Sequence, residues 1–278
     1  MRFPLLIARR YLLSRRLPTA VNVITWVAML GIFVVSAALI VVLSVFNGFG
    51  GLLEELYGAF DPDIRIEAAQ GRIIPNADSL ITLTRQTPGI HAATQVVEGR
   101  ALIQLEDRQQ IVLLKGISIS EFTEVSDAPT LIIAGEFSVR PRRELQSLVV
   151  GSGVAFRLSA YLMDYDHPIT LYTLTQSADL AAAGDQALRH EQGVVSGIFT
   201  LHKEYDDQFV LADMEMTRRL LEMPTGASAI EVRLTPDADR EATLATLTER
   251  LGPGLKVLNA NEQHATLYRI MENEKAVG

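Results

Sequence analysis

The run LPTAVNVITWVAMLGIFVVSAALIVVLSVFNGFGGLL, residues Leu17 to Leu53, contains no charged side chain. A helix over its most apolar part, Val23 to Phe46, is roughly 36 Å long at about 1.5 Å per residue. This length is sufficient to cross a hydrocarbon core of about 30 Å. We therefore predict a membrane-spanning helix here, around which the rest of the chain is organised.

A cleaved export signal is the alternative interpretation of this run. The apolar part of a secretory signal is normally about 7–15 residues long and ends at a small-x-small site. No alanine-x-alanine site of this kind lies between Phe46 and Glu54. Arg9-Arg10 loosely resembles a twin-arginine signal, but the run that follows is too long and too apolar for one. The pattern favours an uncleaved anchor.

The charges on either side of the run predict its orientation. Five of the 25 basic residues precede it, and all 33 acidic residues follow it, so the part before it carries +5 and the remainder −13. Positive charges next to a first span stay on the cytoplasmic side of the membrane. The N-terminus is therefore expected inside the cell, and the chain beyond about Phe60 outside.

The helix is expected to extend past the membrane as a stalk. Apolar residues recur at three- and four-residue spacings from Leu52 to Phe60, and Pro62 then ends the helix. Glycines at positions 48, 50 and 51 can bend it. The expected parts are a cytoplasmic or interfacial foot at 1–20, the transmembrane helix and stalk at 21–60, and a large extracytoplasmic domain at 61–260.

Two strand–helix–strand patterns flank the middle of this domain. Alternating apolar residues predict the strands, and helical spacing of leucines predicts the helices. The first pattern, within 61–104, comprises a strand at Asp63–Ala68, a helix capped by Asn76 and a strand at Ile90–Val97. The second, within 226–260, comprises a strand at Ala229–Leu234, a helix with Thr235 as N-cap and Pro236 at its first position, and a strand at Leu255–Leu258. We expect the two to close into one layer of an α+β fold.

Between them, residues 105–225 are predicted to form an inserted, mainly β subdomain. Its expected elements are a hairpin of Ala101–Leu105 and Gln110–Gly116, a strand at Leu148–Gly151 leading into a helix at Gly153–Leu158, strands at Pro168–Leu174 and Gly193–Leu201, and a helix at Met214–Leu221. The polar, alanine-rich segment Thr175–Gln192 is too weakly apolar to bury much surface. We expect a protruding hairpin or loop there, and long loops of this kind are often functional.

The residues do not predict catalysis. Cysteine is absent, and the Walker A pattern of nucleotide hydrolysis does not occur. Gly151-Ser152-Gly153 is interpreted as a tight turn rather than a nucleophile elbow. His202, Glu204, Asp206 and Asp207 are interpreted as solvated residues of a polar loop rather than a metal site. The carboxylate pairs Glu54/Glu55 and Asp61/Asp63 are interpreted as stalk surface and helix terminator. No cofactor and no metal are expected.

A nucleic-acid partner is also not expected. The domain is acidic, and phosphate binding requires a clustered basic face. The strongest basic run, Arg140-Pro141-Arg142-Arg143, is interpreted as a solvated loop.

Six stretches of the chain together resemble one family of permeases. They are IARRYLLSRR at Ile7–Arg16, VLSVFNGFGGLLEEL at Val42–Leu56, DPDIRI at Asp61–Ile66, LLKGIS at Leu113–Ser118, VVGSGVAFRL at Val149–Leu158 and TLYRIMENEK at Thr266–Lys275. In this order they resemble the LolC/LolE family of lipoprotein-releasing transporter subunits, which belongs with the MacB- and FtsX-like permeases. The most specific of them is the core at Ser44–Phe49.

The resemblance implies a subunit of the bacterial inner membrane with a MacB-like periplasmic domain. Such subunits pair with a second permease subunit, as a homodimer or heterodimer, and with a separate cytoplasmic ATPase. They take lipoproteins from the membrane and pass them to a periplasmic carrier. In the family a helix like the one expected at 261–278 leads into a second span, so the sequence is expected to be cut from a longer chain.

The resemblance also implies two contact regions. The lipid cavity of the family lies beside the outer end of the first span, which makes Val42, Val45, Phe46 and Phe49 candidate contacts for a lipoprotein acyl chain and membrane lipid. In the LolC branch a protruding hairpin grips the carrier.

The corresponding segment here is Thr175–Gln192. Its candidate carrier contacts are Thr175, Asp179, Asp185 and Arg189, with Arg189 as a positive charge opposite an acidic carrier rim. This sequence departs from the family pattern, because the segment contains no proline and is rich in alanine.

Two alternatives remain at the level of sequence. One is a mechanotransmitting permease of the same superfamily that acts in efflux or in control of a cell-wall hydrolase. The other is a single-span anchored periplasmic sensor or scaffold.

Overall fold

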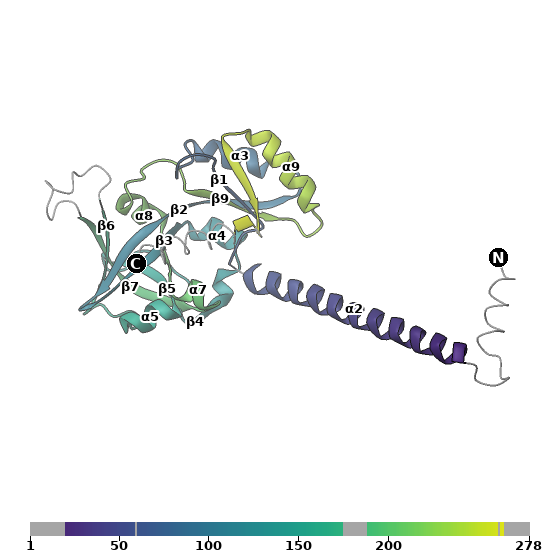
Figure 1. The fold of residues 1–278 in the computed structure, drawn as a ribbon. Helices are drawn as coiled ribbons and strands as arrows, with labels where there is room; N and C mark the ends of the chain where they lie inside the picture. Colours follow the sequence, from purple (N-terminus) through teal and green to yellow (C-terminus); the bar gives the residue numbers. More distant parts are fainter. Residues whose placement is uncertain (1–19, 59, 175–187, 261, 264–278) are drawn as a thin grey trace. The chain divides into compact units, whose positions relative to one another are not determined.

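The computed structural model describes residues 20–58, 60–174, 188–260 and 262–263 (Figure 1). By its internal contacts the chain divides into two compact units, Met1–Glu55 and Leu56–Gly278. The expected helix at 261–278 lies almost wholly outside the described residues.

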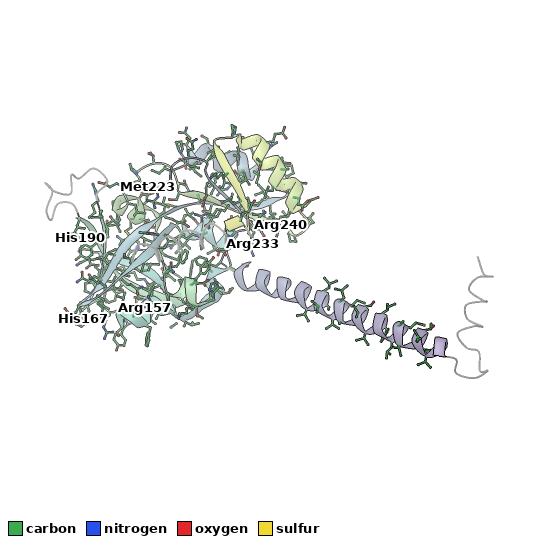
Figure 2. All side chains as sticks on the ribbon, in the orientation of Figure 1. Arg157, His167, His190, Met223, Arg233 and Arg240 are labelled. Carbon is green, nitrogen blue, oxygen red and sulfur yellow. The ribbon has the colours of Figure 1, made fainter. Side chains whose placement is uncertain are left out.

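The first unit contains the long apolar helix that the sequence predicts. Helix α2 spans Ala20–Gly58 without interruption at its glycines. Its window Val23–Val45 has a mean hydropathy of 2.8 and is not buried, and Figure 2 shows its side chains projecting all around the helix. It is the one helix of the described chain that is long and apolar enough to cross a membrane.

The second unit, Leu56–Gly278, contains a four-stranded antiparallel layer built from both ends of the domain sequence. Its strands are, in spatial order, β10 (Leu255–Asn259), β1 (Ile64–Ala68), β9 (Ala229–Leu234) and β2 (Ile90–Leu105). Strand β1 lies between the two strands of the second strand–helix–strand pattern, so the two patterns interleave into one sheet as expected. Helices α3 (Ala77–Arg85) and α9 (Arg240–Leu251) bury apolar side chains against one face of this layer.

The middle of the chain forms a small mixed barrel. Its strands are, in order, β2, β3 (Arg108–Ile117), β8 (Phe209–Asp213), β5 (Gln146–Gly151), β7 (Leu188–Phe199) and β6 (Ile169–Leu174). The barrel closes because β6 pairs with both β7 and β2. The pairs β3–β8 and β5–β7 are parallel, and the other pairs are antiparallel.

Shorter elements complete the domain. They are α4 (Ile119–Val125), the 3-10 helix η1 (Ala128–Leu131), strand β4 (Ile132–Gly135) paired with β7, α5 (Ser152–Leu158), α7 (Lys203–Asp206) and α8 (Met214–Leu220). Helices α5 and α8 add apolar side chains to the barrel core.

Strand β2 joins the layer and the barrel, and the sequence did not predict this. Two separate strands were expected, at Ile90–Val97 and Ala101–Leu105, whereas β2 runs through both. Its first half pairs with β9 and its second half with β3. Gly99 does not end the strand. It makes room for Leu221, whose side-chain carbons would lie 2.6–2.7 Å from a Cβ at this position.

One predicted helix cap is correct in position and the other is wrong. Asn76 is the N-cap residue of α3, but it has the left-handed conformation with φ 57° and makes no side-chain capping bond. Helix α9 begins after Asp239 rather than Thr235, because the Asp239 carboxylate accepts from Ala242 N at 3.1 Å. Thr235 instead accepts from Ala238 N, in the turn that precedes the helix.

The loop interpretation of the region around α7 is also wrong. Asp206 is 8% exposed rather than solvated. Its carboxylate accepts from Thr200 Oγ1 at 2.7 Å, Leu201 N at 2.8 Å and Ser152 Oγ at 3.1 Å. A buried carboxylate that accepts three bonds holds the end of β7 against the start of α5, which is a structural role. Ser152 is the first residue of α5 rather than part of a tight turn.

Candidate functional site at the junction with the span

The residues that follow α2 in sequence are fastened into the domain. We call Phe60–Asp63 the junction segment. The ring of Phe60 is 1% exposed, and its centroid lies 5.7 Å from that of Phe199, 5.2 Å from Tyr205 and 5.4 Å from Phe209. Edge and stacked packing of this kind stabilises aromatic clusters beyond the area that they bury. The ring is therefore an anchor for the segment.

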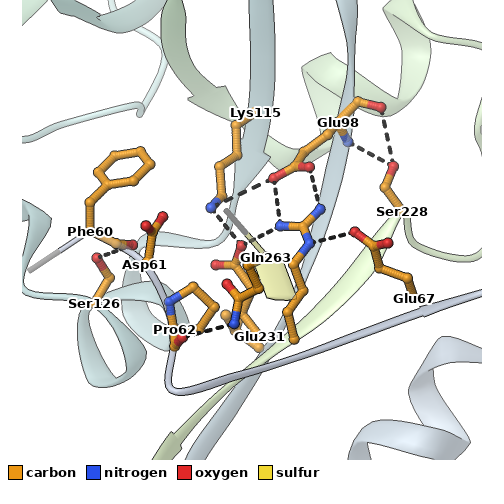
Figure 3. A network of polar contacts seen from close by, with 12 residues as sticks. Phe60, Asp61, Pro62, Glu67, Glu98, Lys115, Ser126, Ser228, Glu231 and Gln263 are labelled. Atoms are coloured by element: carbon orange, nitrogen blue, oxygen red, sulfur yellow. Dashed lines mark hydrogen bonds and ion pairs between the residues drawn. The ribbon is translucent and has the colours of Figure 1, made fainter. Parts of the chain in front are cut away.

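Polar bonds hold the next two residues of the segment. The Tyr205 hydroxyl donates to the carboxylate of Asp61 at 2.7–2.8 Å. Gln263 Nε2 donates to the carbonyl of Pro62 at 3.1 Å (Figure 3). Since Gln263 follows β10, this bond ties the segment that leads into the domain to the segment that leads out of it.

Asp63 completes the attachment of the segment. One carboxylate oxygen accepts from Leu234 N at 2.9 Å, and the other lies 3.0 Å from the guanidinium of Arg240. Helix α2 ends at Gly58, shortly before the pair Asp61/Asp63 that was interpreted as its terminator, but this interpretation missed the role of both carboxylates in the domain. Both side chains bind parts of the domain that lie far away in the sequence, which a local pattern does not reveal.

A network of charged side chains lies on the face of the layer opposite α3 and α9. We call the set Arg65, Glu67, Glu98, Lys115 and Glu231 the ion network. The guanidinium of Arg65 contacts Glu67 at 2.7 Å, Glu98 at 2.5 Å and Glu231 at 2.9 Å. The ammonium of Lys115 contacts Glu231 at 2.6 Å and Glu98 at 3.6 Å.

The strand register brings these charges together. Arg65 on β1 lies directly opposite Glu231 on β9, and Glu98 on β2 lies directly opposite Lys115 on β3. Lys115 and Glu231 are 3% and 0% exposed in their side chains, and Arg65 and Glu98 are 16% and 14% exposed. Opposite charges at such positions satisfy each other away from water.

Burial and neighbouring charges shift the pKa values of Glu98 and Glu231 in opposite directions. Burial alone would raise the pKa of Glu98, but the charges of Arg65 and Lys115 and their hydrogen bonds lower it to about 2. Complete burial raises the pKa of Glu231 in spite of the same two cations. Among the described residues no donor reaches Oε2 of Glu231, which is consistent with this direction.

The ion network adjoins the junction segment through Lys115. Its ammonium lies 5.1 Å from the ring centroid of Phe60 and 5.1 Å from that of Phe122 on α4. Figure 3 shows Lys115 between Phe60 and the carboxylates of Glu98 and Glu231. The two rings shield the ammonium from water, which strengthens its ion pairs.

The sequence contained a weak signal for this network. Arg65, Lys115 and Glu231 interrupt apolar strands in the patterns IRI, LKG and IEV. Such alternation normally marks a strand face that is open to solvent. Only the structure shows that α4 and the junction segment cover this face.

The four predicted lipid contacts all lie on α2. The side chains of Val42 and Val45 are 51% and 65% exposed. The side chains of Phe46 and Phe49 lie outside the described residues. The contact of these four with lipid stays a prediction.

The predicted carrier contacts lie on and beyond the stem of the β6–β7 hairpin. Leu174 pairs with Leu188 at the end of this stem, and Thr175, Asp179 and Asp185 lie outside the described residues. Arg189 is half exposed, and its Nε lies 2.8 Å from Glu222 Oε1. Its positive charge is therefore partly balanced within the domain.

The structure brings together no metal ligands in the part of the chain that it describes: there is no group of three or more histidine or acidic residues suited to a metal ion.

The comparison with known families decides the identity of this fold. Residues 25–250 match the MacB-like periplasmic core domain. The chain belongs to this family. The solved periplasmic region of MacB from Actinobacillus actinomycetemcomitans has the same fold, with a TM-score of 0.51 and 14% sequence identity over 80% of this chain and 98% of that one.

Two relatives of this MacB-like chain confirm the resemblance predicted from the motifs. The lipoprotein-releasing system transmembrane protein LolC of Neisseria meningitidis serogroup B is 27% identical over 245 residues, which is 87% of this chain and 56% of LolC. LolE of Haemophilus influenzae is 26% identical over 254 residues, 90% of this chain and 59% of LolE. The chain thus spans little more than half the length of these relatives.

A pH dependence is expected from Glu98. Because its folded pKa of about 2 lies below the ordinary 4.5, ionised Glu98 stabilises the folded chain above about pH 4.5, and this contribution is lost as the pH falls toward 2. We expect the difference in free energy of unfolding between wild type and Glu98→Gln to shrink over this window. Urea unfolding at several pH values measures it, and an unchanged difference would contradict the assignment.

Proposed function

We propose that the chain is the first part of a non-catalytic permease subunit of an ABC transporter that releases lipoproteins from the bacterial inner membrane. The observation that carries this proposal is the similarity to LolC and LolE over 87% and 90% of the chain. On this proposal a cytoplasmic ATPase subunit supplies the energy, a second permease subunit completes the membrane part, and a periplasmic carrier receives the lipoprotein.

The apolar helix and the charge distribution support the proposed membrane arrangement. The window Val23–Val45 suits a span, and the positive residues before it place the N-terminus in the cytoplasm. The domain from Leu56 onward then lies in the periplasm.

The junction segment supports a role in transmitting movement. A span that moves during ATP hydrolysis can act on the domain only through covalently connected residues that are held firmly by it. Phe60, Asp61 and Asp63 are held by aromatic packing, hydrogen bonds and an ion pair. A loosely tethered sensor domain would not require such an attachment.

Substrate contact is proposed at the outer end of the span. Val42, Val45, Phe46 and Phe49 would meet the acyl chains of the lipoprotein. Carrier contact is proposed at the β6–β7 hairpin, where Arg189 presents a charge that Glu222 partly balances.

Photocrosslinking in the reconstituted transporter tests this function. A photoreactive amino acid at position 46 should capture lipoprotein, and one at position 189 should capture the carrier during turnover. Position 26, near the other end of the apolar window, and position 249 on α9 serve as matched controls and should capture neither.

Absence of both captures in a complex that still hydrolyses ATP would overturn lipoprotein release. That outcome would favour a permease for efflux or for hydrolase control.

A further inference from the structure

Lys115 contacts three parts of the domain at once. It stands on β3 of the barrel and pairs with Glu231 on β9 of the layer at 2.6 Å. It also approaches Glu98 on β2, the strand common to both, at 3.6 Å. Its ammonium lies 5.1 Å from the rings of Phe60 in the junction segment and Phe122 on α4.

The Lys115–Glu231 ion pair directly joins the barrel to a strand that pairs only within the layer. Strand β9 pairs with β1 and β2, whereas β3 pairs with β2 and β8. Both side chains are almost completely buried. The strength of a buried pair depends steeply on its distance and on the exclusion of water.

The ring of Phe60 excludes water from one side of the Lys115 ammonium. A displacement of the junction segment would move the ring, admit water to the ammonium and weaken its pairs with Glu98 and Glu231. The relation between the layer and the barrel would then change with the position of the junction segment.

We propose that Lys115 is a positioning residue of the transport cycle, which couples displacement of the junction segment to the relative arrangement of the layer and the barrel. This inference rests on the proposed function and names the group through which the movement passes. Lys115 touches no substrate in this role and acts through Phe60 and Glu231.

The double variant Lys115→Met/Glu231→Gln tests the role without leaving a buried charge unpaired. Methionine keeps the length and apolar stem of lysine, and glutamine keeps the shape of glutamate, so the chain is expected to fold. Leu247→Ala is the matched control, because Leu247 is 0% exposed in the core beneath α9 and belongs to a different cluster. It lowers stability without touching the ion network.

Two measurements on the reconstituted transporter decide the proposal. In the double variant, hydrogen exchange at the amides of Phe60, Asp61 and Asp63 should be at least about tenfold faster than in wild type, a factor that corresponds to 1.4 kcal/mol. The number of ATP molecules hydrolysed per lipoprotein released should rise at least about fivefold, the lower end of typical coupling effects. Leu247→Ala should show neither change.

Unchanged exchange in the double variant would overturn the proposal, as would unchanged coupling or an equal loss of coupling in Leu247→Ala. The exchange measurement does not require lipoprotein release. If the wild-type transporter releases no lipoprotein, the proposed function is wrong. If the double variant releases lipoprotein with normal hydrogen exchange and normal coupling, only the proposed role of Lys115 is wrong.

Discussion

Replacing Arg65 by methionine is expected to lower the free energy of unfolding by about 3–5 kcal/mol, the usual cost of breaking a buried ion pair. The change removes contacts with Glu67, Glu98 and Glu231 at 2.5–2.9 Å. It leaves the carboxylates of Glu98 and Glu231 to share the single ammonium of Lys115. Urea unfolding of the detergent-solubilised chain, followed by near-UV circular dichroism, measures the loss.

Two further variants show whether this cost is electrostatic. Arg157→Met removes an ion pair of similar length, 2.6 Å, between a half-exposed arginine and Asp207 (Figure 2). It should lower the free energy of unfolding by less than about 1 kcal/mol. Arg65→Met/Glu98→Gln restores charge balance around the remaining Lys115–Glu231 pair and should recover part of the loss. An equal cost for Arg157→Met, or no recovery in the double variant, would show that packing rather than charge dominates.

Replacing Phe60 by alanine is expected to lower the free energy of unfolding by about 3–5 kcal/mol, the typical cost of truncating a buried phenylalanine. The variant loses three aromatic contacts and opens a cavity beside Lys115. Because Phe60 lies in the junction segment, the same change should speed the hydrogen exchange of Asp61 and Asp63. Unfolding and exchange measured on the same preparation test both effects.

Phe156→Ala is the matched control for this variant. Phe156 lies on α5 and is 84% exposed, so its loss should change the free energy of unfolding by no more than about 0.5 kcal/mol. A comparable loss in both variants would mean that the Phe60 cluster is not the anchor that its burial indicates.

Local patterns predicted most of the elements correctly. The strands β1, β9 and β10 alternate in a way that fixes which residues face α3 and α9. The hairpin of β2 and β3 turns at Glu106-Asp107 as expected, since Leu105 pairs with Arg108. The helices α5 and α8 also lie within a residue or two of their predicted bounds.

The failures have identifiable physical causes. Strand β8 was missed because its FVLAD sequence is buried on both sides and shows no alternation. Strand β2 was divided in two because a glycine within a strand is usually read as a break, whereas Gly99 accommodates Leu221. The start of α9 was misplaced because the capping bond of Asp239 competes with the Thr235-Pro236 signal.

The sequence by itself determined the apolar helix, its expected orientation and the family motifs, because these depend on composition and on neighbouring residues. The tertiary structure decided the junction segment and the ion network. Arg65 bonds to Glu98 and Glu231 across 33 and 166 residues, and Lys115 to Glu231 across 116. A charge on an alternating strand faces water unless another segment covers it, and only the packing of Phe60 and Phe122 turns these residues into a buried network.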